Sequence, residues 1–102
     1  MAFERVVALS VVDQDVYAQY RNEIRSLLDE VGADFRFDFA VSQVLRGDGA
    51  EHANRAFVLR FPDRAAHDYF FGDTRYGAIK RRLVDPSVAS VVVIAEYEIG
   101  TS

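Results

Sequence analysis

Two segments rich in β-branched residues, one near each end of the chain, cover residues 4–12 and 88–98. Each would be apolar on both sides of an extended strand. In the first segment the two sides carry Val7, Leu9 and Val11, and Val6, Ala8 and Val12. An antiparallel sheet with one face in water alternates apolar and polar residues instead. Both terminal strands are therefore expected in a sheet whose two faces are covered.

Helical and alternating patterns fill the space between these strands. Apolar residues at helical spacing from Val16 to Val31 predict a helix, which Asp13 caps and Gly32 ends. Period-two alternation then predicts strands over 35–46 and 54–61, joined through the polar turn 47–53 into an antiparallel hairpin.

A second helical region follows the hairpin. Pro62 ends the third strand, Asp63 is placed to cap a helix over 64–71, and Gly72 closes that helix. Asp73 can cap a further short helix that runs to about residue 83. The order β-α-β-β-α-β predicts one α+β domain over residues 1–102. Its expected fold is ferredoxin-like, a four-stranded antiparallel sheet with the helices on one face.

Two helices can cover only one face of such a sheet. A bare apolar face would be a liability for a monomer, and a second copy packed sheet to sheet around a two-fold axis is the simplest cover. The alternative is that residues 72–87 or the chain ends fold over this face. We expect a homodimer.

Composition excludes several classes of function. The net charge is −4 and the only basic cluster is residues 80–82, so a nucleic-acid partner is not expected. There is no cysteine and there are only two histidines, so no metal or cofactor is expected. His52, with Asp48 and Glu51, fits a polar loop better than a metal site. No apolar run is long enough to span a membrane and no signal peptide is evident, which predicts a cytoplasmic protein.

Four segments, taken in order, resemble a known family: residues 11–20, 44–48, 57–63 and 73–76. The chain is similar to the domain-of-unknown-function 1330 family of the dimeric α/β-barrel superfamily, which also contains cofactor-independent antibiotic-biosynthesis monooxygenases. The resemblance implies a dimeric ferredoxin-like barrel and does not imply an activity. The chain departs from the family at Phe70-Phe71, where a Trp-Tyr pair is typical, and at Asp38-Phe39, where glycines are usual.

The second helix and the segment after it provide one set of candidate site residues. The apolar face of this helix is expected to centre on Ala66, Tyr69 and Phe70, with His67 and Phe71 to one side of it. An aromatic residue off the main core face needs another partner, which could be a ligand, the other subunit or the 73–83 segment. His67, Phe71 and Tyr76 therefore form a candidate pocket in which His67 could act as an acid or base. The alternative is that His67 is a surface or interface residue.

The hairpin provides a second, separate set. Alternation places Arg36, Asp38, Ser42 and Arg60 on one face, with Asp38 and Arg60 as near neighbours. Such a group could bind an anionic or carbonyl substrate, or it could be a cross-strand ion pair. We rank the helix set slightly above the sheet set.

Three functions remain open. The first is a dimeric protein that binds a small apolar or aromatic molecule. The second is a cofactor-independent monooxygenase or isomerase with His67 as its base. The third is a structural or regulatory dimer whose interior is filled by side chains. An enclosed cavity with His67 or Arg60 on its wall would favour the first two.

Overall fold

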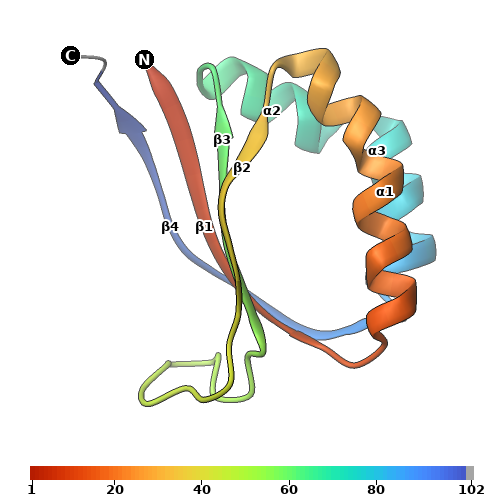
Figure 1. Ribbon diagram of the computed structural model, residues 1–102. Coiled ribbons are helices and arrows are strands. Elements are labelled where there is room, and N and C mark those ends of the chain that lie inside the picture. The colour runs from red at the N-terminus through yellow and green to blue at the C-terminus, as the bar shows by residue number, and fades with distance from the viewer. Residues whose placement is uncertain (101–102) are drawn as a thin grey trace.

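A computed structural model of the chain describes residues 1–100. The elements follow in the order β1 (Ala2–Val11), α1 (Gln14–Val31), β2 (Asp34–Ala40), β3 (Arg55–Phe61), α2 (Arg64–Gly72), α3 (Thr74–Ile79), a π-helical turn η1 (Lys80–Val84) and β4 (Val88–Ile99). The strands form one antiparallel sheet in the order β2-β3-β1-β4. All helices lie on one face of the sheet (Figure 1), so the ferredoxin-like α+β fold is confirmed.

The helix ends lie where local chemistry places them. The carboxylate of Asp13 accepts a hydrogen bond from the backbone N–H of Val16, and that of Asp63 accepts one from Ala66. Helix α1 ends at Gly32, whose φ of 71° lies in the left-handed region that suits glycine. These three boundaries confirm the predicted caps.

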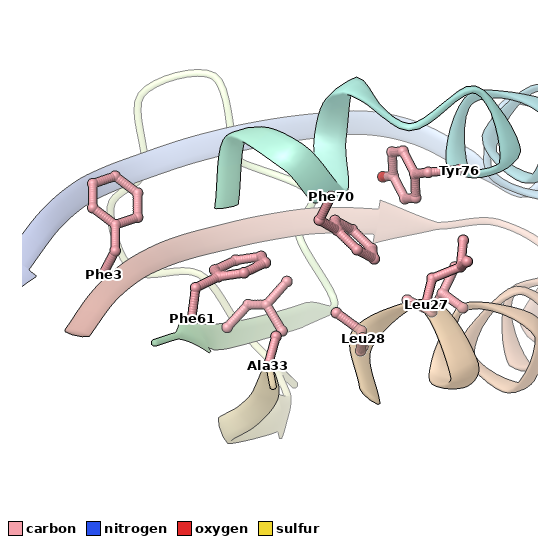
Figure 2. Packing of buried hydrophobic residues seen from close by; sticks show 9 residues of the cluster. Phe3, Leu27, Leu28, Ala33, Phe61, Phe70 and Tyr76 are labelled. Atoms are coloured by element: carbon pink, nitrogen blue, oxygen red, sulfur yellow. The ribbon is translucent and has the colours of Figure 1, made fainter. Parts of the chain in front are cut away.

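Aromatic and aliphatic side chains fill the space between helices and sheet. Phe61 on β3 is fully buried and packs against Phe70 of α2, which contacts Tyr76 of α3. Figure 2 shows these side chains, from three elements, in one cluster with Leu27 and Leu28 of α1. The helices are therefore held to the sheet by burial of apolar surface.

Strand β2 differs from its prediction in length and in phase. It ends at Ala40 rather than at residue 46. A bulge at Arg36 makes Phe35 pair with Leu59 but Phe37 pair with Val58, so the side chains after the bulge change face. Phe35 lies on the helix side, and Phe37 lies on the opposite side.

The buried face of α2 is rotated relative to the prediction. Tyr69, expected at the centre of the apolar face, is exposed, and His67 is buried together with Phe70. The ring of His67 lies 4.7 Å from that of Phe3 and 5.2 Å from that of Phe61. Contact with the curved start of the sheet, rather than helix periodicity alone, therefore decides which side of α2 is buried.

The face of the sheet opposite the helices, which we call the open face, is only partly covered. Residues 72–87 lie on the helix side, where η1 contacts α1, so they do not cover the open face. Instead the 41–54 loop packs against one end of this face, with Ala50 and Ala53 beside Ala8. Phe39 and Ile94 stay 54% and 60% exposed.

Candidate functional site

A cavity of about 260 Å³ lies between the sheet and the helices. Its floor includes Val7 and Leu9 of β1. Its walls are mainly aromatic and come from both layers: Tyr20, Phe35, Phe57, Phe70, Phe71 and Tyr76. An apolar cavity of about 150 Å³ is enough to hold benzene, so this one has room for a larger aromatic group.

Two tyrosine hydroxyls meet in the cavity wall. Tyr20 Oη and Tyr76 Oη are 3.2 Å apart, and either can donate to the other. Burial and the neighbouring Tyr76 hydroxyl raise the pKa of Tyr20 well above its ordinary value, so it stays protonated at neutral pH. Only one of the two hydroxyl hydrogens is needed for the bond between Tyr20 and Tyr76, so the other is free to donate elsewhere. The pair can therefore donate a hydrogen bond to a ligand oxygen.

An ion cluster lies beside the cavity, where Arg21 of α1 is part of the lining. Asp38 accepts two hydrogen bonds from Arg55, both of 2.9 Å, and two from Arg21, of 3.0 and 3.2 Å. The bonds from Arg55 and then from Arg21 lower the pKa of Asp38 to about 2. Arg21 also donates through Nε to Tyr17 Oη at 2.8 Å and lies over the ring of Phe35. The cluster thus joins α1 to the β2–β3 hairpin.

A second polar group lies at the Phe71 end of the cavity. Arg5 of β1 lines the cavity, and its guanidinium is 4.2 Å from the centre of the Phe71 ring. Its Nη1 donates to Glu96 at 3.0 Å and is 3.4 Å from His67 Nε2. The other ring nitrogen of His67 is 2.8 Å from Asp68. Both nitrogens of His67 therefore face protein side chains.

A third polar group lies on the open face, away from the cavity. Glu4 is fully buried there and accepts hydrogen bonds from Arg36 and from Tyr97, with Arg60 Nε 3.5 Å away. The bond to Glu4 raises the pKa of the Tyr97 phenol. These partners account for the burial of a carboxylate on the open side of the sheet.

The helix set and the sheet set of predicted residues have different positions. Phe71 and Tyr76 line the cavity, while His67 is 7% exposed and lies behind Arg5 and Phe71 rather than on the wall. The sheet set does not stay together. Because of the bulge at Arg36, Asp38 faces the helices and Arg60 faces the open side, so the expected Asp38–Arg60 neighbourhood is wrong.

Arg5 is one of the cavity residues that the sequence interpretation missed, together with Tyr20 and Arg21. Arg5 is two residues before Val7 and four before Leu9, so its side chain lies on the same side of β1 as theirs. The alternation along the strand had already placed Val7 and Leu9 on one side. An arginine at an inward position of an otherwise apolar strand was the available signal.

Within residues 1–100, no group of three or more acidic or histidine side chains is arranged to hold a metal ion. No helix of that range is long and apolar enough to cross a membrane.

Comparison with known proteins identifies a family and several similar structures. The profile of the family described as "Domain of unknown function (DUF1330)" matches residues 5–97. No curated protein matches the sequence. A solved protein of unknown function from Rhodopseudomonas palustris is similar, with 15% identity, a TM-score of 0.78, and coverage of 99% of this chain and 84% of that one.

Two further structures share the fold. A dimeric ferredoxin-like protein of unknown function from Jannaschia has 15% identity and a TM-score of 0.67, with coverage of 97% of this chain and 100% of that one. A candidate antibiotic biosynthesis monooxygenase from Bacteroides thetaiotaomicron has 12% identity and a TM-score of 0.61, with coverage of 91% and 85%. At these identities the likeness shows the fold alone.

Proposed function

The chain belongs to the DUF1330 family of unknown function, and we propose that it is a homodimer. We propose further that it binds a small apolar or aromatic molecule in the cavity between its helices and its sheet. The observation that carries this proposal is the aromatic-walled cavity of about 260 Å³. Ligand sites are typically concave and apolar, with a few polar groups that fix orientation. The tyrosine hydroxyl pair and Arg5 are such groups.

The cavity also bears on the structural alternative. A purely structural dimer was expected to have its interior filled by side chains, because empty space in a core costs stability. Here the space is retained while Phe35, Phe57 and Phe71 stand around it. A retained cavity of this lining supports binding rather than packing alone.

The homodimer is supported by the open face. Phe37, Phe39 and Ile94 are 45%, 54% and 60% exposed on the side of the sheet that no helix covers. A similar structure is described as dimeric. We expect light scattering over a dilution series to give the mass of a dimer at micromolar concentration. A monomer under these conditions would contradict this part of the proposal.

Binding in the cavity can be tested with 2-naphthamide, a neutral two-ring probe, by isothermal titration calorimetry. Val7→Phe would place a larger side chain into the cavity floor and should abolish binding, while Val12→Phe, at a 65% exposed position, should leave it unchanged. Circular dichroism confirms that each variant is folded. If both variants bind the probe as tightly as the wild type does, the cavity is not the site.

The enzyme alternative is a cofactor-independent monooxygenase or isomerase. The similar fold of a candidate monooxygenase supports this alternative. His67 is the base that we propose in that case; because it lies behind Arg5 and Phe71, it would reach a substrate only after one of these side chains moves aside. Oxygen uptake with a bound aromatic substrate tests this alternative. Turnover that His67→Ala leaves unchanged would exclude His67 as the base.

A further inference from the structure

Arg5 is an unusual residue for the place it occupies. It lies on the helix-facing side of β1, opposite Leu59 on one neighbouring strand, and lines a cavity whose floor is Val7 and Leu9. A charged side chain in apolar surroundings carries a desolvation cost. The Arg5 side chain is 23% exposed, so it lies at the rim of the cavity, where part of that cost is avoided.

The other cationic side chains of the cavity have their partners within the protein. Arg21 donates from Nε to Tyr17 and from both terminal nitrogens to Asp38. Lys80 is half exposed to solvent and pairs with Asp85 at 3.2 Å. Neither is placed to act as the main charged contact of a ligand.

Arg5 uses only one of its nitrogens. Nη1 donates to Glu96 and lies near His67, whereas Nε and Nη2 have no acceptor among residues 1–100. The ring of Phe71 against the guanidinium restrains its plane. A planar guanidinium with unused N–H groups matches the geometry of a carboxylate, which can accept two parallel hydrogen bonds.

We propose that the ligand of the cavity is an aromatic carboxylate of one or two rings, with its rings among the cavity aromatics and its carboxylate on Arg5. This inference rests on the proposed function and adds the chemical class of the ligand. The cavity volume of about 260 Å³ suits a body of that size. At the rim the carboxylate keeps part of its hydration, which lowers the cost of binding a charge.

The remaining unused donor points to the same class. The Tyr20–Tyr76 pair can supply one further hydroxyl hydrogen to the cavity. Both it and Arg5 offer donors, so the complementary ligand carries acceptor oxygens. Since a tyrosine oxygen can also accept a hydrogen bond, it is Arg5, which can only donate, that disfavours a ligand rich in donors, such as an aromatic amine.

The test compares 2-naphthoate with 2-naphthamide, which has the same rings and no charge, by isothermal titration calorimetry at pH 7. Wild type should bind 2-naphthoate at least about tenfold more tightly, as expected of a charge-assisted hydrogen bond. Arg5→Gln should abolish this preference, because it weakens the binding of 2-naphthoate more strongly than that of the neutral 2-naphthamide. Arg81→Gln removes an exposed charge outside the cavity lining and should keep the preference.

Glu96→Gln provides a second variant that leaves Arg5 in place and serves if Arg5→Gln does not fold. Removing the rival carboxylate should strengthen binding of 2-naphthoate and not that of 2-naphthamide. Equal binding of both probes by wild type, or a preference that survives Arg5→Gln, overturns this inference but leaves the proposed function standing. Binding of neither probe contradicts the proposed function as well.

Discussion

The two faces of the same sheet present opposite kinds of surface. On the helix side, aromatic residues enclose a cavity and Arg5 retains unused donors at its rim. On the open face, Phe39 and Ile94 are exposed, and Glu4 is fully enclosed by its own partners. Both faces contain charged groups within apolar surroundings. The difference is that two nitrogens of Arg5 have no acceptor among residues 1–100, whereas Glu4 accepts hydrogen bonds from Arg36 and Tyr97. For this reason we propose the helix side for a ligand and the open face for a second subunit.

The largest contrast is expected in folding stability. Phe61→Ala removes a fully buried ring on the helix side and should lower the free energy of unfolding by about 3–5 kcal/mol. Phe39→Ala removes a ring that is 54% exposed, so it should cost less than about 1 kcal/mol in dilute protein. Urea unfolding measures both. Equal losses would mean that the open face belongs to the folding core.

Dimerisation should depend on the open face more than on the helix side, the reverse of the order expected for folding stability. Ile94→Asp places a charge on the open face and should weaken dimerisation by about 2–3 kcal/mol, roughly a hundredfold in dissociation constant. Ala18→Asp puts the same charge on an exposed position of α1 and serves as the control. Sedimentation velocity over a concentration series reports both. A dimer that tolerates Ile94→Asp would place the interface elsewhere.

His67 and Asp68, neighbours at the Phe71 end of the cavity, should differ in how much they contribute to folding stability. Since its ring is buried against Phe3, Phe61 and Phe71, His67→Ala should destabilise the fold by about 2 kcal/mol. Asp68→Ala removes only the exposed partner of His67 Nδ1 and should cost less than about 1 kcal/mol. Thermal unfolding of the two variants checks this order. A negligible effect of His67→Ala would contradict its buried position.

The smallest effect concerns pH. The pKa of Asp38 is lowered to about 2 in the folded protein, against an ordinary value of 3.8. Its carboxylate therefore stabilises the fold above pH 4, and this contribution is lost as the pH falls toward 2. Because the site is partly exposed, we expect wild type to exceed Asp38→Asn by only about 1 kcal/mol at pH 7. Urea unfolding should show the difference disappearing near pH 2; a difference that persists there would contradict this assignment.

The features predicted from the sequence are those set by neighbouring residues. Asp13, Asp63 and Gly32 act within one helical turn, so the helix ends could be placed from local chemistry. The antiparallel sheet with the helices on one face followed from the order of the elements. The placement of Phe71 and Tyr76 at a cavity agrees with their interpretation as a possible pocket, although their role in binding remains a prediction.

The features that escaped prediction depend on distant contacts. The bulge at Arg36 inserts one residue into the β2–β3 pairing, which simple alternation cannot reveal, and it moves Asp38 to the helix side. The rotation of α2 that buries His67 and exposes Tyr69 depends on the shape of the sheet beneath it. Each of these single changes redistributes the residues of a candidate site.

The central claim is that the ligand site lies on the helix side, and amide chemical shifts during a titration with 2-naphthoate test it most directly. We expect the shifted residues to be those around the cavity, such as Leu9, Tyr20, Phe71 and Tyr76. Shifts confined to the open face, at Phe37, Phe39 and Ile94, would contradict the claim and would assign the site to the surface that we give to the second subunit.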